Sequence, residues 1–524
     1  MKKEIIGITV IFSGALLGGC TQKQNETGPP NIIFIMTDDH AYQAISAYGY
    51  DLIHTPNLDR LAEEGAIFKQ CYVTNSICGP SRAVVLTGKH SHINGMISNI
   101  NPNLHFDGSQ QTFPKIMQEN GYQTAIIGKW HLGSTPTGFD HFDILPGQGN
   151  YYNPDFINEN GRYNTEGYVT SIITDKTIDW IKTASRNEQP FMVKMHHKAP
   201  HRNWKAETQY LDLFEDRTFD LPVNFHGDYS GRGAAAREQE MEIGRHLFWG
   251  WDLKFEQDPF TGEPTEQRYL EYLERMNEEQ ITAWRNAYNP RNQAFIESNP
   301  TETDILMFKF QRYIRDYLKT IQSVDDSVGE LMKFLEENGL DKNTVVIYAS
   351  DQGFYLGEHG WYDKRFIYEQ SFRTPLMIWY PKEIKPGTVV NKLVQNLDFA
   401  PTILDYARLE IPEDIQGRSM RQLALGKTIP WRDAIYYHYY EYPSVHMVKR
   451  HYGIRTDRYK LVHFYYDVDE WELYDMQDDP NEMQSVYHDQ AYETIKNEMK
   501  KKLTDIREYY GDSKELQESF LPEN

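Results

Sequence analysis

The sequence is poor in cysteine, poor in basic residues relative to acidic ones, and poor in long apolar runs. Three cysteines among 524 residues exclude a small domain built on disulfides. The 54 Lys and Arg against 76 Asp and Glu give a net charge of −22, which excludes the basic surface of a general nucleic-acid binder. By the same argument, net charge disfavours any other polyanion as a partner. Beyond the N-terminus, no segment is typical of a membrane-spanning helix.

The residues that are present predict a large folded protein. Hydrophobic residues make up 40% of the chain and aromatic residues 14%, which is enough for a sizeable core. This composition excludes wholesale disorder. The length corresponds to about three domains of average size, or to one large α/β domain with a smaller addition.

The N-terminus has the pattern of an export signal. Lys2 and Lys3 precede a short apolar run, Ile5–Leu17, and the run ends in Leu17-Gly18-Gly19-Cys20, which resembles the bacterial lipoprotein signal. We therefore expect a signal peptide over residues 1–19, a lipid on Cys20 and a polar tether over residues 20–30. The protein would be exported and anchored to a bacterial membrane, at the periplasmic or cell-surface face of the outer membrane. The alternative is an ordinary secretory signal in which Cys20 occurs by chance.

Short apolar runs typical of buried strands alternate with segments of helical spacing. The predicted strands are Asn31–Met36, Ala125–Ile127, Pro190–Met195, Val345–Ala349 and Leu376–Tyr380. The predicted helices are Pro56–Phe68, Phe113–Asn120, Ser171–Ala184 and Lys309–Asn338. This alternation predicts an α/β fold with a large mixed, mostly parallel sheet sandwiched by helices. Active sites in such folds lie beyond the carboxyl ends of the strands.

Two regions depart from this alternation. Residues 206–303 are polar and rich in Glu, Arg, Tyr and Trp, with a predicted helix over Tyr269–Tyr288. We interpret them as an insertion over the active edge of the sheet, and a plain surface excursion is the alternative. After residue 430, β-forming segments precede a predicted terminal helix; they are Tyr436–Tyr442, His451–Thr456, Tyr459–Tyr466 and the helix Tyr492–Tyr509. The expected organisation is a catalytic domain over residues 31–429 and a smaller α+β subdomain over residues 430–524.

The most specific motif runs from Cys78 to Gly88, with the pattern Cys-x-Pro-Ser-Arg-x-x-x-Leu-Thr-Gly. It resembles the signature of the type I, formylglycine-dependent sulfatases of the alkaline phosphatase superfamily. The resemblance implies that a maturation enzyme oxidises Cys78 to formylglycine, whose hydrate is a diol that Arg82 fixes. The alternatives for Cys78 are an inert buried thiol and a disulfide with Cys71.

Paired carboxylates indicate a metal site. Asp38-Asp39 follows the first predicted strand, and Asp351-Gln352 follows the strand Val345–Ala349 in the same manner. Adjacent carboxylates repel each other unless a cation joins them, and their oxygens suit Ca²⁺. The family resemblance implies one Ca²⁺ held by Asp38, Asp39, Asp351, Gln352 and the modified residue 78. Gln352 stands where many relatives have Asn or His.

The remaining site residues come from further segments that resemble the family. In Gly128–Gly133, Lys129 would anchor a sulfate oxygen and His131 would lie near the formylglycine. His201, in the run Lys198-Ala199-Pro200-His201, and Lys364 would flank the scissile ester oxygen. The candidate contacts to the sugar are Arg365, His359 and His446. The run from Asp351 to Arg365 resembles polysaccharide-directed bacterial sulfatases more than sulfatases that act on small aryl esters.

The implied activity is hydrolysis of sulfate esters on sulfated polysaccharide or oligosaccharide fragments, from algal walls, glycosaminoglycans or mucins. The diol would attack sulfur with Asp351 as base, and His201 or Lys364 would protonate the leaving oxygen. His131 would then take a proton from the remaining hydroxyl and release sulfate. The alternatives are a phosphatase or phosphodiesterase of the same superfamily and a glycan-binding lipoprotein without catalysis. A two-zinc site would favour the phosphatase, whereas the donors found here favour one oxygen-ligated ion.

Overall fold

The computed structural model describes residues 1, 28–101 and 104–522. Cys20, nearly all of the predicted signal peptide and most of the predicted tether lie outside these residues. Within them, no helix combines the length and the apolar character that crossing a membrane requires.

A ten-stranded sheet forms the centre of the molecule. Its strands, in spatial order, are β12 (Thr388–Val390), β2 (Ala66–Phe68), β11 (Leu376–Trp379), β9 (Thr344–Ser350), β1 (Asn31–Thr37), β8 (Phe191–His196), β4 (Gln123–Lys129), β5 (His141–Leu145), β6 (Asp155–Asn158) and β7 (Gly161–Asn164). The five strands from β9 to β5 run parallel, while β11, β6 and β7 pair antiparallel with their neighbours. The predicted mixed, mostly parallel sheet is confirmed.

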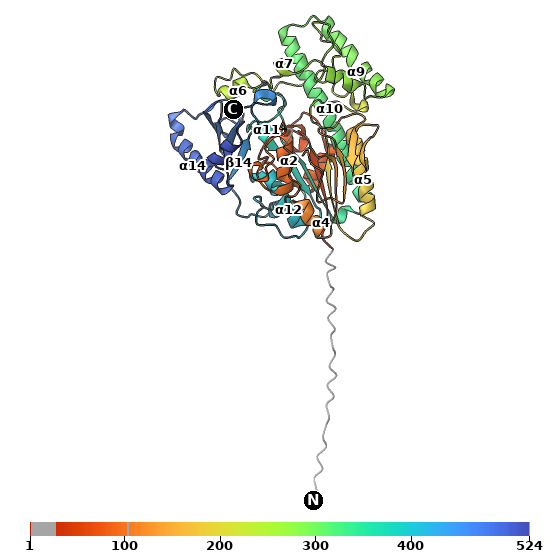
Figure 1. Ribbon diagram of the computed structural model, residues 1–524, viewed down its shortest axis with the longest axis vertical. Helices are drawn as coiled ribbons and strands as arrows, with labels where there is room; N and C mark the ends of the chain where they lie inside the picture. The colour runs from red at the N-terminus through yellow and green to blue at the C-terminus, as the bar shows by residue number, and fades with distance from the viewer. Residues whose placement is uncertain (2–27, 102–103, 523–524) are drawn as a thin grey trace.

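Helices cover both faces of this sheet, as Figure 1 shows. Ile33 and Ile35 of β1 pack in one core with α1 (Pro56–Glu64), α5 (Val169–Ala184) and α10 (Glu302–Glu337). Ile32 and Phe34 point to the other face and pack with α2 (Cys78–Thr87), α4 (Phe113–Glu119) and α12 (Phe399–Tyr406). Because successive side chains of a strand alternate between faces, an all-apolar strand such as β1 fits between two helical layers.

Two predicted helices are wrong in extent. The segment Pro56–Phe68 is helical only to Glu64, and its last three residues form β2 beside β11. Gly65 makes this close approach possible, since a Cβ there would lie 2.4 Å from the carbonyl oxygen of Ile378. The segment Tyr269–Tyr288 is split into α8 (Gln267–Leu273) and α9 (Glu278–Glu297). Asn277 caps α9 in a capping box with Gln280, which fixes the new helix start.

The predicted insertion contains α6 (Ala234–Glu238), α7 (Ile243–His246), α8 and α9, with α7 and α9 at the top of Figure 1. Its middle part contacts the loop that carries Lys364. The backbone N–H of Tyr362 donates to the carbonyl of Met241 at 2.9 Å, and Glu240 N donates to His446 O at 2.8 Å. These contacts favour the interpretation that part of the insertion covers the active edge of the sheet.

The C-terminal region forms its own antiparallel sheet of β14 (Ala434–Tyr439), β15 (His451–Thr456), β16 (Tyr459–Phe464) and β17 (Glu470–Asp475), packed on α14 (Glu493–Tyr509). The α+β character predicted for this region is confirmed, and β17 is an additional strand. The smaller elements are α3 (Ser91–Asn94), α11 (Glu369–Phe372), α13 (Arg421–Ala424), α15 (Lys514–Ser519) and a short sheet of β10 (Arg373–Thr374), β3 (Cys71–Tyr72) and β13 (Val394–Gln395).

Candidate active site

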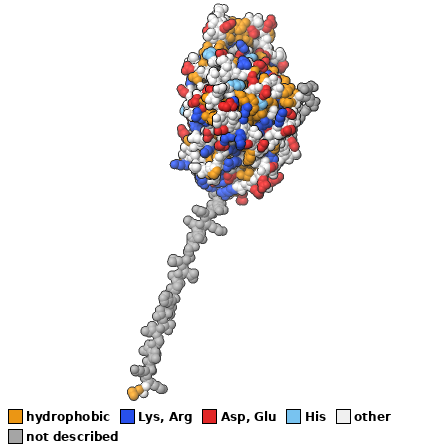
Figure 2. All heavy atoms as spheres, turned by 90° about the vertical axis from the view of Figure 1, so that its left-hand side faces the viewer, with side chains coloured by type: hydrophobic (Ala, Val, Ile, Leu, Met, Phe, Trp, Pro, Cys, Tyr) orange, Lys and Arg blue, Asp and Glu red, His pale blue; other side chains and the backbone are white. Residues whose placement is uncertain are grey.

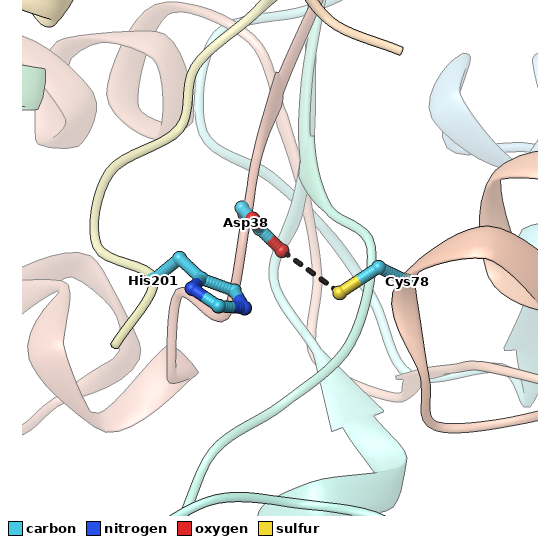
Figure 3. Close-up of side chains that lie close together, drawn as sticks. All are labelled: Asp38, Cys78 and His201. Atoms are coloured by element: carbon cyan, nitrogen blue, oxygen red, sulfur yellow. Dashed lines mark hydrogen bonds between the residues drawn. The ribbon is translucent and has the colours of Figure 1, made fainter. Parts of the chain in front are cut away.

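Several site residues follow the carboxyl ends of four neighbouring parallel strands, at one edge of the sheet. Asp38 and Asp39 follow β1, Lys129 ends β4, His201 comes after β8, and Asp351 follows β9. Since β9, β1, β8 and β4 are adjacent and parallel, their carboxyl ends meet at one place. Cys78 reaches the same place from the first position of α2. Figure 3 shows the side chains of Asp38, Cys78 and His201 pointing toward one another.

Cys78 is a buried, neutral thiol. Its Sγ donates to Asp38 Oδ1 at 3.2 Å, and Lys364 Nζ and Gln352 Nε2 lie 3.5 and 3.6 Å from the sulfur. Burial, together with the Asp38 carboxylate, raises the pKa of Cys78 to about 12. A thiol with this pKa is a poor nucleophile at neutral pH. Cys71 is also buried and free, so the disulfide considered between the two cysteines is absent.

Three carboxylates crowd beside this thiol, each with a cation. Oxygens of Asp38, Asp39 and Asp351 lie within 4.8 Å of one another. Lys129 forms an ion pair with Asp38, Lys364 pairs with Asp39, and Arg82 NH2 lies 2.8 Å from Asp351 Oδ2; all of these side chains are buried.

The surroundings move the carboxyl pKa values apart. Burial opposes ionisation of Asp38, but the positive charges of Lys129 and Arg82 hold its pKa well below the usual range. Burial raises the pKa of Asp39, and burial and the charge of Asp38 raise the pKa of Asp351 to about 7. Burial therefore disfavours the ionised forms of Asp39 and Asp351, and a further cation beside them would favour those forms.

This donor set fits a hard divalent cation. Among the described residues, Asp39 Oδ2 and Gln352 Oε1 are buried oxygens without a hydrogen-bond partner. With Asp38 and Asp351 they offer carboxylate and carboxamide oxygens, which Ca²⁺ prefers. Asp38, Cys78 and His201 also bring one oxygen, one sulfur and one nitrogen within 4.8 Å of one another, so residue 78 borders the same site.

Arg82 contacts the carboxylate cluster, the backbone and His196, and among the described residues no hydrogen bond joins it to Cys78. Its Nε donates to Asp351 Oδ2 at 3.0 Å and its NH1 to the carbonyl of Lys129 at 2.7 Å. The arginine lies one helical turn after residue 78, as the spacing indicates, but the guanidinium is directed at the base of the predicted reaction. Arg82 therefore positions Asp351.

His201, His131 and Lys364 are the remaining predicted catalytic residues at this edge of the sheet. The ring Nδ1 of His201 hydrogen-bonds with the carbonyl of Arg202, which leaves Nε2 to face Asp39 Oδ2 at 3.8 Å. Burial lowers the pKa of His201 and of His131 well below the usual range, so both rings are neutral. Although burial opposes it, the Asp39 carboxylate raises the pKa of Lys364, so its ammonium group stays charged.

Two of the three predicted sugar contacts lie together beside Lys364. Asp363 pairs with the guanidinium of Arg365, and its Oδ2 lies 3.2 Å from His446 Nε2. His359 is placed differently: it is 2% exposed, contacts Arg232 at 3.1 Å and packs against Trp361. In the part of the chain that the structure describes, no hydrogen bond joins His359 to the cluster around Cys78, so the predicted sugar contact at His359 stays without geometric support.

The structure adds residues that the motifs did not indicate. Asn99 Oδ1 accepts from the backbone N–H of Gly79 at 2.9 Å and so holds the start of α2. Gln148 accepts from Lys129 Nζ and fixes its ammonium group. Asp363 lies inside the sequence run from Asp351 to Arg365, but only its contacts with Arg365 and His446 identify it as a residue of the site. Asn99 and Gln148 lie on loops outside every motif, where no sequence signal indicates them.

A cavity of about 590 Å³ opens beside His131. Its lining includes Asn99 and the apolar side chains Met96, Trp130, Phe142 and Leu145. Asn99 connects the cavity to the start of α2, because it binds the residue after Cys78. The cavity is thus a neighbour of the carboxylate and thiol cluster.

Comparison with known families and proteins finds similarity to sulfatases over most of the chain. The family model for sulfatases matches residues 30–409, and the model "N-sulphoglucosamine sulphohydrolase, C-terminal" matches residues 357–509. An N-acetylglucosamine-6-O-sulfatase of Bacteroides thetaiotaomicron is 48% identical over 520 residues, covering 98% of this chain and 92% of that protein. The human N-acetylglucosamine-6-sulfatase is 28% identical, covering 81% of this chain and 70% of that protein.

Solved structures agree with the sequence comparison. A protein in complex with its substrate D-glucosamine-2-N,6-O-disulfate superimposes with a TM-score of 0.89 at 48% identity, covering 93% of this chain and 99% of that one. A phosphonate monoester hydrolase of Agrobacterium radiobacter shares the fold, with a TM-score of 0.65 at 18% identity. The non-catalytic and phosphatase alternatives are not supported: the chain belongs to the sulfatase family and is a sulfate-ester hydrolase.

Proposed function

We propose that this protein removes the 6-O-sulfate from glucosamine residues of glycosaminoglycan-type saccharides. The observation that carries the proposal is the 48% identity, over nearly the whole chain, to a protein whose structure contains D-glucosamine-2-N,6-O-disulfate as substrate. An N-acetylglucosamine-6-O-sulfatase at the same identity supports the same ring position. The pairing of Asp363 with Arg365 and His446 beside Lys364 supplies polar groups suited to sugar hydroxyls.

The proposal includes formylglycine at position 78 and one Ca²⁺. Asp38, Asp39, Asp351 and Gln352 would hold the ion, which would draw charge from the sulfate oxygens, while the formylglycine diol would supply the attacking hydroxyl. The neutral, buried thiol of Cys78 supports this assignment, because it offers no thiolate for direct attack.

The other residues of the site would bind, orient and move protons. Lys129 and Lys364 would hold sulfate oxygens, and Arg82 would orient Asp351 through its 2.8 Å contact. Asp351 would receive the proton of the attacking hydroxyl. Lys364 Nζ, which carries a proton, would protonate the departing sugar oxygen. His201 Nε2 would serve only after taking up a proton, because the neutral ring holds its single proton on Nδ1 against the Arg202 carbonyl. His131 would accept the proton whose removal frees the sulfate. Arg365, His446 and Asp363 would contact the sugar, and the sugar contact of His359 stays a prediction.

Export and anchoring belong to the same proposal. The signal over residues 1–19, a lipid on Cys20 and a tether to residue 30 would place the enzyme at the periplasmic or outer face of a bacterial outer membrane. There it would meet saccharide fragments, and a maturation enzyme would have to act on Cys78 before the buried site closes. The domain limits of 31–429 and 430–524 likewise stay proposals.

The test combines mass spectrometry with sulfate release. We expect the peptide around Cys78 to carry formylglycine and the protein to release sulfate from glucosamine-6-O-sulfate. Cys78→Ala should lower turnover at least 1,000-fold while circular dichroism and the unfolding temperature stay close to wild type. Cys71→Ala is the matched control, since Cys71 is equally buried and free but lies in β3, paired with Thr374 and Val394. Near-wild-type turnover by Cys78→Ala would refute the mechanism.

A further inference from the structure

An arginine and two aromatic rings form a platform on the insertion, outside the proposed catalytic cluster. The guanidinium of Arg268 lies 4.9 Å from the ring centre of Phe248 and 4.4 Å from that of Trp251. Phe248 is 44% exposed, which is unusual for a ring of its size, and Arg268 is exposed as well. We call these three side chains the Arg268 platform.

Short contacts connect this platform to the proposed sugar site. Arg202 NH1 lies 3.4 Å from His446 Nε2, and the Arg202 guanidinium lies 5.6 Å from the ring centre of Phe248. His446 in turn lies 3.2 Å from Asp363, the neighbour of Lys364. The platform is thus separated from Asp363 by His446 and Arg202.

The local backbone holds the platform in place. The Glu266 carboxylate accepts from the backbone N–H groups of Gly250 and Trp251 at 3.0 and 2.9 Å. This fixes the turn that carries Trp251 against the start of α8, where Arg268 stands. Gly250 permits the close approach, since a Cβ there would lie 2.4 Å from Thr265 Oγ1.

The two arginines beside Phe248, Arg202 and Arg268, differ in whether a carboxylate neutralises them. Arg202 is neutralised by Asp252, with which it makes hydrogen bonds of 2.8 and 2.6 Å. Across the described ranges 28–101 and 104–522, Arg268 has neither a salt bridge nor a hydrogen bond with another residue. It stacks on Phe248 and Trp251, and the charges of Arg202, Asp252 and Glu266 act on it from farther away. A guanidinium stacked in this way keeps its edge N–H groups free for bidentate binding of a carboxylate or sulfate.

We infer that the Arg268 platform is a subsite for an anionic sugar next to the sugar that carries the scissile sulfate. Arg268 binds the carboxylate or sulfate of that neighbour, and Phe248 packs against the ring. The inference rests on the proposed function, because it uses the same substrate orientation. It gives the insertion a role in selecting acidic oligosaccharides in a chain whose net charge of −22 otherwise repels them.

The test compares three substrates in kinetic assays: glucosamine-6-O-sulfate, a disaccharide that joins it to a uronic acid, and one that joins it to a neutral hexose. The wild type should have a higher kcat/KM for the acidic disaccharide than for the neutral one. Arg268→Ala should lower kcat/KM for the acidic disaccharide about tenfold through KM, with kcat unchanged. Its effect on the monosaccharide should stay within about twofold. Phe248→Ala should weaken both disaccharides equally.

A control variant and two contrary outcomes test the subsite independently of the proposed function. Arg245→Ala removes the same charge from an exposed site of the insertion, where Arg245 pairs with Glu242, and should change no substrate preference. Equal effects of Arg268→Ala on all three substrates, or no acidic preference in the wild type, would overturn the subsite. Failure of the wild type to release sulfate from any 6-O-sulfated glucosamine would instead overturn the proposed function.

Discussion

At the scale of single residues, the site balances three buried carboxylates against three buried cations. Asp38, Asp39 and Asp351 lie close enough for each to affect the charge of the others, and Lys129, Lys364 and Arg82 each pair with one of them. Removal of one partner from such a pair leaves an uncompensated buried charge, which costs about 3–5 kcal/mol. Substitutions here therefore affect folding as well as activity, and tests need readouts that separate the two.

The first residue-scale prediction concerns the departing sugar. If His201 protonates the leaving oxygen, His201→Ala should lower kcat on a sugar sulfate at least 100-fold. The same variant should lose no more than about tenfold on a nitrophenyl sulfate, because that leaving group departs without protonation. Steady-state kinetics with both substrates measure the ratio. Equal losses on both would assign the proton to another group, of which Lys364 is the nearest choice.

The second residue-scale prediction concerns the metal. Asp39→Asn keeps the size of the side chain but removes a carboxylate whose Oδ2 is unpartnered among the described residues. We expect the wild type to bind one Ca²⁺ and the variant to bind it at least tenfold more weakly, measured by calorimetry and by the calcium dependence of the unfolding temperature. Tight stoichiometric zinc in the wild type would contradict the assignment.

At the scale of elements, tight backbone contacts hold the ligand-bearing turns. Gly353 follows the metal ligand Gln352, and a Cβ at this position would lie 2.2 and 2.3 Å from the carbonyl oxygens of Gln370 and Arg373. Backbone atoms cannot yield as a side chain can. Gly353→Ala should cost about 2–3 kcal/mol of unfolding free energy and displace Gln352, lowering turnover. Gly227→Ala is the control, since its Cβ would meet only Met483 Cε at 3.2 Å.

A second element-scale prediction concerns strand β15 and pH. His451 Nδ1 donates to the Lys449 carbonyl at 2.8 Å, and Nε2 accepts from Ile367 N–H at 3.1 Å, which requires a neutral ring. Burial lowers the pKa of His451 to about 3. The unfolded ring titrates near 6.5, so below this pH the unfolded state binds the extra proton and stability falls. At pH 5 the loss from this ring reaches about 2 kcal/mol.

His451→Gln tests this element directly. The glutamine carbonyl can still accept from Ile367 N–H but cannot titrate. The variant should be less stable than the wild type at pH 7, because packing is lost, yet its unfolding temperature should fall less steeply from pH 7 to pH 5. Parallel slopes for the two proteins would show that His451 does not contribute to acid sensitivity.

At the scale of the whole molecule, the buried cations Lys129, Lys364 and Arg82 attract a sulfate group, whereas the net negative charge of the chain repels sulfated polymers. Acidic and basic side chains are mixed over the face that Figure 2 shows, and the chain as a whole carries −22. We expect a higher kcat/KM per sulfate on short oligosaccharides than on the intact polymer, because the acidic far field repels long polyanions. Added salt should narrow this difference by screening. Tighter binding of the polymer at matched sulfate concentration would refute the argument.

Much of the fold follows from local patterns along the chain. The apolar run at Asn31–Met36 is a buried parallel strand because it packs on both faces, and the motif around Cys78 gives the helix that begins there. One prediction fails where an apolar segment leaves a helix and pairs with a strand. Ala66–Phe68 continues a helical pattern, but pairing with β11 is worth more than one further helical turn. A second prediction fails at Asn277, where a capping box starts a new helix within the segment predicted as one continuous helix.

The sequence by itself determined the sulfatase motif, the carboxylate pairs at strand ends, and the alternation that builds a parallel sheet, because each depends on residues close in the chain. Only the tertiary structure decided that Arg82 turns to Asp351, that Asp363 joins Arg365 to His446, that His359 packs against Trp361, and that Arg268 stacks beside the proposed sugar site. The contacts of Arg82 with Asp351 and of Asp363 with His446 join loops that are far apart in sequence. Their partners are chosen by packing and by the need of buried charges for neutralisation, which no local pattern encodes.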